Sequence, residues 1–479
     1  MDYMQKRTSC TAMLVGKDAT VDGSTIIARN EDGYAPIGPK KFIVRAAKSE
    51  ANGYFVSPTT GVKIPLPKEA LRYTCEPSDE SDHNLYEEAG INEKNVAMSA
   101  TETTFTNQRF LGFDPLVDDG LNEEGMVNVV LPFINSAREG VKRLGSLIEK
   151  YGTGESNGIA FSDNQEIWYL ETAGGHHWVA QRIPDDAYAI APNQVNIQQI
   201  DFNDTDNFMW SSDLPEFVEK HNLNNSPEDF NFRNIVGTNS ESDIYYNTPR
   251  SWYGQKLFSP EVKQAPTSRE IPFIQHANRK LSVEDVEYFL SSHYQETEFD
   301  PFTNEKEFDK QTFRSIALDR NQISHILQIR NDVDPKYAAI EWVAMGFFAY
   351  SPYVPFYTNI ETTPINYQKA NSEVTMDSAY WMYKILSVLV EPHYHDFINQ
   401  VNQYREICQS YALRRIDNVD NQIKQMLNES SDEDITDKLT AESIITADSI
   451  TNKTKKLMQD LIKQSLNLSK ITFESGDNL

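Results

Sequence analysis

The sequence has few cysteines: Cys10, Cys75 and Cys408 are the only three among 479 residues. Three scattered thiols supply no disulfide framework, and this usage is typical of a reducing compartment. Residues 1–9 contain no apolar stretch, which excludes a signal peptide and, with it, a lipid anchor on Cys10. We therefore expect a cytoplasmic protein.

Basic residues are also scarce, with 44 Lys and Arg against 71 Asp and Glu and a net charge of −27. Because nucleic acids and anionic membranes bind basic surfaces, we expect neither as a partner. No apolar run approaches the length of a transmembrane helix. The aromatic content of 11% argues against a disordered acidic chain, and the length predicts two or three domains.

The segment that begins at Cys10 predicts a β-hairpin. An apolar, β-branched run, Thr11–Val15, is followed by the turn dipeptide Asp22-Gly23 and a return strand over residues 25–28. If the hairpin pairs about its middle, residues whose numbers sum to about 39 face each other across it. That register places Cys10 directly beside Arg29.

Three chemically distinct groups then gather at the open end of the hairpin: the Cys10 thiol, the Arg29 guanidinium and, just beyond, the Asp32 carboxylate. An arginine beside a thiolate lowers its pKa and makes it a competent nucleophile. A buried cysteine at the start of a core strand is the simpler interpretation. It does not account for the sequence Arg-Asn-Glu-Asp at the far end of the hairpin.

Residues 1–9 are interpreted as a leader or propeptide. If they are removed, Cys10 gains a free α-amine with a pKa of about 7.7–8.0. Such an amine accepts the thiol proton near neutral pH without any histidine.

The motif over residues 10–32, Cys-Thr-x-x-x-Val-Gly-x-x-Ala-Thr-x-Asp-Gly-Ser-Thr-x-x-x-Arg-Asn-x-Asp, resembles the start of the N-terminal-nucleophile hydrolases. Specifically, it resembles the cysteine dipeptidase A family, which is related to penicillin V acylase, bile salt hydrolase and the secernins. Segments 324–330 and 351–357 and Trp342 also resemble that family, so the resemblance covers most of residues 10–370.

The resemblance implies an α+β fold: a four-layer αββα sandwich of two antiparallel sheets. Alternating residue patterns agree with it and predict strands over 95–101, 157–161, 167–172 and 178–182, with a hairpin at Gly174-Gly175. Helical periodicity predicts helices over 135–151 and 283–293. We expect the hydrolase domain to span residues 10–371.

A C-terminal helical region is expected over residues 372–479, with amphipathic helices over 376–390, 396–427 and 435–466. Two interpretations stay open for these helices, a layer packed on the sandwich or an oligomer interface. We expect a homo-oligomer.

The resemblance also assigns further site residues. Asn193, which follows Pro192, is the expected oxyanion donor, and Arg250 is the expected second arginine near the nucleophile. Arg29 would support the thiolate, and Asp32 would hold the Cys10 amine. Related acylases carry an Asn or Tyr donor where this chain has Glu102 and Thr103.

An ionised Glu102 cannot donate a hydrogen bond, so the second oxyanion donor stays open between a Thr103 hydroxyl and a backbone N–H. Glu102 would instead suit the α-ammonium of a dipeptide.

Neither a metal nor a cofactor is expected. The pairs His176-His177 and His393-x-His395 lack the spacing of zinc peptidases, and no phosphate-binding or dinucleotide motif is present. His325 is expected to be a satisfied core histidine.

The sequence thus predicts a cysteine dipeptidase that acts on short peptides through a thioester acyl-enzyme. Two alternatives remain: an amidase of non-peptide amides, of the penicillin V or bile salt type, and a non-catalytic protein similar to secernins.

Overall fold

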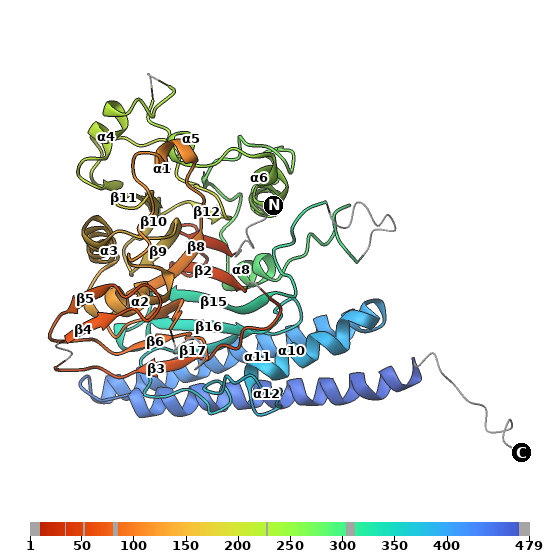
Figure 1. The fold of residues 1–479 in the computed structure, drawn as a ribbon. Helices are drawn as coiled ribbons and strands as arrows, with labels where there is room; N and C mark the ends of the chain where they lie inside the picture. The colour runs from red at the N-terminus through yellow and green to blue at the C-terminus, as the bar shows by residue number, and fades with distance from the viewer. Residues whose placement is uncertain are drawn as a thin grey trace, which may run out of the picture.

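Two large antiparallel sheets form the centre of the chain in a computed structural model that describes residues 10–33, 35–50, 53–79, 85–226, 229–302 and 312–468. The expected leader, residues 1–9, lies outside the described residues. The sheets face each other, because β2 contacts β8, β9 and β10 of the second sheet (Figure 1).

The first sheet has seven strands in the order β14-β12-β1-β2-β15-β16-β17. Its strands are β1 Thr11–Val15, β2 Thr25–Asp32, β12 Tyr188–Ala191, β14 Ile274–Gln275, β15 Asn321–Ile329, β16 Ala339–Met345 and β17 Val354–Tyr357. Most of these strands are apolar on both faces, since one face packs on the second sheet and the other on helices.

The second sheet has six strands in the order β13-β11-β10-β9-β8-β7. They are β7 Ala89–Ile91, β8 Ala97–Thr103, β9 Asn157–Ser162, β10 Ile167–Ala173, β11 His177–Ile183 and β13 Phe208–Trp210. The expected hairpin is confirmed, because Ala173 pairs with His177 across Gly174-Gly175. Two small ribbons pair β3 Ile43–Arg45 with β6 Tyr73–Cys75 and β4 Gly53–Val56 with β5 Lys63–Leu66.

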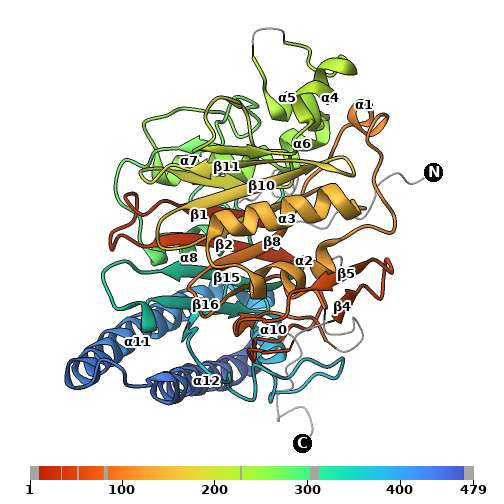
Figure 2. The same cartoon turned by 90° about the vertical axis from the view of Figure 1, so that its left-hand side faces the viewer.

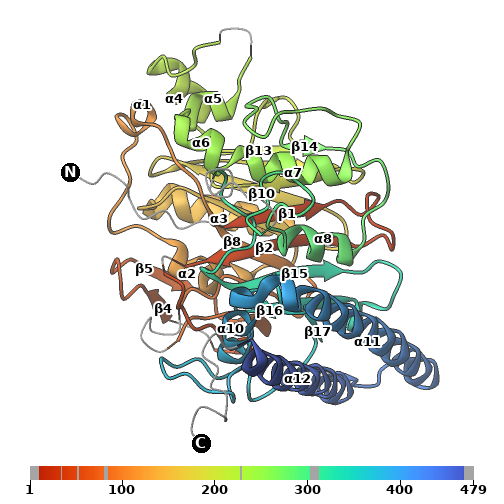
Figure 3. The same cartoon turned by 90° about the vertical axis from the view of Figure 1, so that its right-hand side faces the viewer.

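Helices cover the outer faces of both sheets. On the second sheet lies α3 Ala137–Tyr151, in front in Figure 2, with α2 Glu123–Val130 against β8. On the first sheet lie α7 Thr248–Phe258, α8 Val283–Leu290 and α10 Ala379–Val390, as Figure 3 shows. Shorter helices connect these elements: α1 Gln108–Leu111, α4 Leu214–Lys220, α5 Phe232–Val236, α6 Glu241–Tyr246, η2 Leu131–Phe133, η3 Pro335–Tyr337 and η4 Glu391–His393.

The expected C-terminal helical region is present. After α10 come α11 Tyr394–Glu429 and α12 Thr436–Asn467, which pack on each other and on β17 along one side of the molecule (Figure 1). Cys408 of α11 and Ile450 of α12 belong to the same hydrophobic core as Trp342 of β16. These helices are therefore a layer packed on the first sheet. Among the described residues, no helix combines the length and the apolar character needed to cross a membrane.

The predicted hairpin forms, but the predicted register is wrong. Thr11 pairs with Asn30 and Ala12 with Arg29, so paired numbers sum to 41. The error arises because β2 continues to Asp32 and residues 16–24 form a longer connection than a two-residue turn. A shift of two residues leaves every side chain on its original face, so Arg29 is still a diagonal neighbour of Cys10.

Candidate active site

Cys10 lies immediately before β1, and only 2% of its surface is exposed. Nη1 of Arg29 donates a hydrogen bond to the Cys10 thiol over 3.2 Å. The sequence prediction that these two residues meet is therefore confirmed, through a diagonal contact across the hairpin.

Arg29 is held on every side by buried groups. Its Nη2 forms an ion pair of 2.6 Å with Glu88, and Nη1 donates to the Thr101 carbonyl over 2.7 Å. Nη2 also reaches the Ala100 carbonyl at 3.1 Å, and Nε reaches Ser99 Oγ at 3.1 Å. Because the guanidinium is planar and its five donors have fixed directions, these contacts fix the direction in which Nη1 points.

The thiol of Cys10 does not have the lowered pKa that its position beside an arginine predicts. Burial raises the pKa of Cys10 well above its ordinary value, Arg29 opposes this only in part, and Glu102 adds to the rise. In this form the thiol is protonated at neutral pH. A base is therefore needed before Cys10 attacks a substrate.

Arg250, in the first turn of α7, lies on the other side of Cys10 and is fully buried. Its Nη1 donates to the Cys10 carbonyl and, over 2.9 Å, to Thr11 Oγ1. Its Nη2 donates to Asn193 Oδ1 over 2.9 Å and to Asn247 Oδ1 over 2.7 Å. Arg250 thus joins the nucleophile's main chain to the predicted oxyanion residue.

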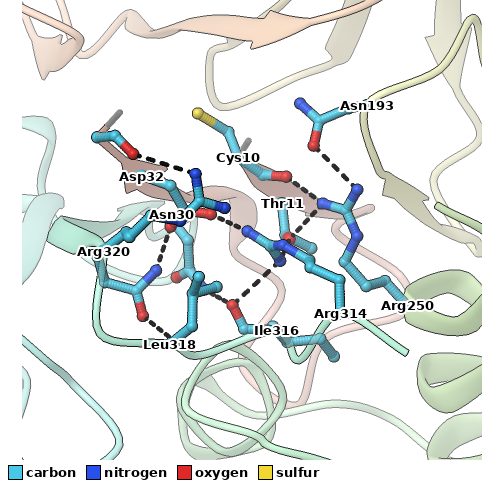
Figure 4. A network of polar contacts seen from close by, with 12 residues as sticks. Cys10, Thr11, Asn30, Asp32, Asn193, Arg250, Arg314, Ile316, Leu318 and Arg320 are labelled. Atoms are coloured by element: carbon cyan, nitrogen blue, oxygen red, sulfur yellow. Dashed lines mark hydrogen bonds and ion pairs between the residues drawn. The ribbon is translucent and has the colours of Figure 1, made fainter. Parts of the chain in front are cut away.

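Asn193 follows β12, which pairs with β1 through Ala12 and Ala191. Continuing that register brings Asn193 opposite Cys10, and Figure 4 shows the two residues next to each other. Since Oδ1 accepts from Arg250, the amide nitrogen points the other way and donates to the Thr103 carbonyl over 3.0 Å. The NH₂ group has a second hydrogen that can serve an oxyanion.

Asp32 lies at the end of β2, where its carboxylate contacts the Arg314 guanidinium (Figure 4). The Asp32 carboxylate also accepts a hydrogen bond from the Asn321 amide. Arg314 in turn donates to Thr11 Oγ1 over 3.2 Å. The structure therefore places Asp32 within the network around Cys10. Its role toward the Cys10 amine stays a prediction.

Comparison with known proteins shows the family of the chain. A profile of peptidase family C69 matches residues 9–407. The chain belongs to peptidase family C69. A "Probable dipeptidase" of Latilactobacillus sakei is 46% identical over 98% of both chains. "Dipeptidase A" of Lactobacillus helveticus is 40% identical over 98% of this chain and all of the relative, and "Dipeptidase" of Bifidobacterium longum is 40% identical over 87% and 84%.

Glu102 of this C69 peptidase is a buried carboxylate at the end of β8, 1% exposed. Neither of its oxygens has a hydrogen-bond partner among the described residues. Burial raises the pKa of Glu102 to about 8, with Arg250 and Arg29 opposing the rise. The neighbouring residue, Thr103, contributes its carbonyl to Asn193.

Sequence reasoning missed two groups that position the site. Arg314 lies outside every motif and reaches Asp32 across a long sequence separation. Glu171 on β10 accepts hydrogen bonds from the backbone N–H groups of Asn196 and Ile197, at 2.7 and 3.0 Å, and so holds the loop that carries Asn193. The sequence shows that Glu171 is an acidic residue within a predicted strand, but it does not show that this carboxylate is buried.

The remaining histidines and cysteines fall elsewhere. His176 and His177 both contact Asp114, at 3.1 and 2.7 Å. Cys75 and Cys408 are buried free thiols. Within the described ranges, no three His, Cys, Asp or Glu residues form a cluster suited to a metal ion.

Proposed function

We propose that this chain is a cysteine dipeptidase that acts on short peptides and uses Cys10 as its N-terminal nucleophile once residues 1–9 are removed. One observation carries the proposal: Arg29 contacts the Cys10 thiol while Arg250 binds the Cys10 carbonyl and the Asn193 amide. Membership of family C69 and the printed names of the relatives support peptide bonds, and dipeptides in particular, as the substrate.

The proposal includes the fold type. The two facing antiparallel sheets with helices on their outer faces are interpreted as the sandwich of N-terminal-nucleophile hydrolases, over residues 10–371. Residues 372–479 are the added helical region. This division of the chain is part of the proposal.

The buried, protonated thiol explains why the α-amine is needed. While Ser9 is attached, the Cys10 nitrogen is an amide with no basic lone pair. After cleavage it is an amine with a pKa of about 7.7–8.0, which accepts the thiol proton near neutrality. Asp32 contacts Arg314, and Arg314 contacts Thr11, so a carboxylate is held close to the start of β1, next to Cys10.

The chemical steps follow from these positions. The Cys10 sulfur attacks the peptide carbonyl, and the negative charge on its oxygen is stabilised by the Asn193 amide, whose orientation Arg250 fixes. The C–N bond breaks, the leaving amine takes the proton from the Cys10 α-ammonium, and a thioester remains. Water then hydrolyses the thioester, with the same amine as base.

Glu102 is proposed to bind the α-ammonium of the substrate. With a pKa of about 8, Glu102 is largely protonated in the free enzyme, and a cation beside it favours its ionised form. Its oxygens have no hydrogen-bond partner among the described residues, and the α-ammonium of a dipeptide supplies both a donor and a cation. This feature disfavours an amidase of neutral amides. Glu102→Gln should raise KM for free dipeptides and have little effect on N-acetylated ones, whereas equal effects on both would remove this role.

The test of the proposal is hydrolysis of a dipeptide panel beside penicillin V and glycocholate. Cys10→Ala should abolish dipeptide hydrolysis, while the matched control Cys408→Ala, also a buried thiol, should keep it. Wild-type activity in Cys10→Ala would overturn the proposal. Loss of activity with a chelator, restored by zinc or manganese, would favour a metallopeptidase instead.

A further inference from the structure

A line of buried polar groups leads away from the nucleophile into the space between the two sheets. His325 on β15 pairs directly with Arg29 on β2 in the register of the first sheet, and it is completely buried. Its Nε2 lies 2.8 Å from Ser99 Oγ, and its Nδ1 lies 2.9 Å from Glu76 Oε2. As expected from the sequence, His325 is a satisfied core histidine, but its partners connect it to the site.

A neutral imidazole is able to make both of the His325 contacts at once. Ser99 Oγ accepts from Arg29 Nε over 3.1 Å and has one hydrogen of its own to donate. Burial and the nearby Arg29 lower the pKa of His325 well below its ordinary value, so the imidazole is neutral and carries a hydrogen on one of its two nitrogens. It therefore donates to one of its partners, Ser99 or Glu76, and accepts from the other. Because burial raises the pKa of Glu76 to about 8, the Glu76 carboxyl can serve as acceptor or as donor in this contact.

This line of hydrogen bonds ends at Nε of Arg29, whose Nη1 contacts the Cys10 thiol. The guanidinium is planar, so fixing Nε at Ser99 fixes the plane in which Nη1 reaches the Cys10 thiol. Ser99 comes from β8 of the second sheet and His325 from the first, so the line also sets the position of Arg29 between the sheets.

Stability alone does not explain these groups. A buried histidine and carboxylate lose solvation, and apolar residues of similar volume often stabilise a core equally well or better. These buried polar groups are therefore better explained by their contact with Arg29.

We propose that Glu76, His325 and Ser99 are positioning residues that hold the Arg29 guanidinium against the Cys10 thiol. This inference rests on the proposed function, in which Cys10 is the nucleophile. Outer partners that orient a metal-bound ligand typically contribute about 10- to 100-fold to activity or affinity. We expect a loss of that size in kcat, with KM little changed, when the line is broken.

The experiment uses the full chain in its active form. Ser99→Ala removes the contact to Arg29 Nε, and Ser324→Ala is the matched control. Ser324 is a buried serine next to His325 on β15, and its hydroxyl contacts Asn30 and Tyr353 and donates to the main-chain carbonyl of Arg29 over 3.3 Å. Among the described residues it makes no hydrogen bond with the Arg29 guanidinium, so the control separates the main chain of Arg29 from its side chain. A second pair compares His325→Gln, whose amide takes the place of Nε2, with His325→Asn, whose amide takes the place of Nδ1.

Two readouts are measured for each variant: kcat and KM on a dipeptide, and the pH dependence of alkylation at Cys10, followed by peptide mass. Ser99→Ala should lower kcat about 10- to 100-fold and move the alkylation profile to higher pH. Ser324→Ala should leave both unchanged, and His325→Gln should keep more activity than His325→Asn. A purely structural role would lower thermal stability without moving the alkylation profile.

Wild-type kcat and an unchanged alkylation profile in folded Ser99→Ala would overturn this inference, as would equal activity in the Gln and Asn variants of His325. The proposed function fails separately, through an active Cys10→Ala variant. If Cys10→Ala is inactive and Ser99→Ala is unaffected, the positioning role of Glu76, His325 and Ser99 fails while the proposed function stands.

Discussion

At the scale of single residues, the two arginines beside Cys10 bind different atoms. Arg29 contacts the thiol, whereas Arg250 contacts the carbonyl and orients Asn193. The sequence predicted that Cys10, Arg29, Asn193 and Arg250 lie together, and their contacts agree; their catalytic roles stay predictions. The sequence did not show Arg314, which no motif includes, or the raised pKa of the thiol, since that pKa depends on burial by distant segments.

Asn193→Ala should reduce kcat by about 10²–10³-fold, the usual effect of removing one oxyanion donor. The matched control is Asn331→Ala. Asn331 also donates to a backbone carbonyl, that of Gly23 at 2.8 Å, but is exposed at the other end of the hairpin. Activity of Asn193→Ala within a few-fold of wild type would contradict the assignment of this loop.

At the scale of elements, residue patterns predicted the strands β1, β2 and β8–β11 and the helices α3, α8, α10, α11 and α12, but not the short helices α4–α6 or the strands β15–β17. The pairing of the strands needed information that the sequence does not display. The hairpin register was wrong by two residues because the connection is long, and the position of β15 beside β2 joins segments far apart in the chain. The sequence also does not show where two elements approach each other closely. Helix α3 packs on the second sheet with glycines at the contact, and a Cβ on Gly145 would lie 2.3 Å from Cε2 of Trp178.

Gly145→Ala should therefore destabilise the protein, by about 1–3 kcal/mol, because the added methyl overpacks the contact with Trp178. Helix propensity alone predicts the opposite sign, a gain of about 1 kcal/mol. Urea denaturation measures the difference. A variant more stable than wild type would show that Trp178 moves aside at little cost.

At the scale of the whole molecule, long amphipathic helices made the C-terminal region predictable, and they share one core with the first sheet. Many carboxylates are buried around and beyond the active site. Burial raises the pKa of Glu102 and Glu287 to about 8 and that of Glu171 to about 7. Because these pKa values differ between the folded and the unfolded chain, the free energy of unfolding depends on pH.

The sign follows from proton binding. Between pH 4.5 and about 8 these three carboxyls hold more protons folded than unfolded, so the free energy of unfolding falls as pH rises. The lowered pKa of His325 acts in the opposite sense only below its unfolded value of about 6.5, and that of Lys384 only above about 8. We therefore expect a lower Tm at pH 8 than at pH 6.5, measured by circular dichroism. A Tm that rises over this interval would contradict the assigned shifts.

The central claim, that Cys10 acts with a free α-amine, is tested most directly by the intact mass of purified, active enzyme. The account predicts a chain that begins at Cys10, with the bond between Ser9 and Cys10 broken. If Cys10→Ala protein is trimmed at the same bond, a host protease makes the cut; if it is not, Cys10 makes the cut itself. Fully active enzyme that retains residues 1–9 would contradict the account, because the Cys10 nitrogen would still be an amide.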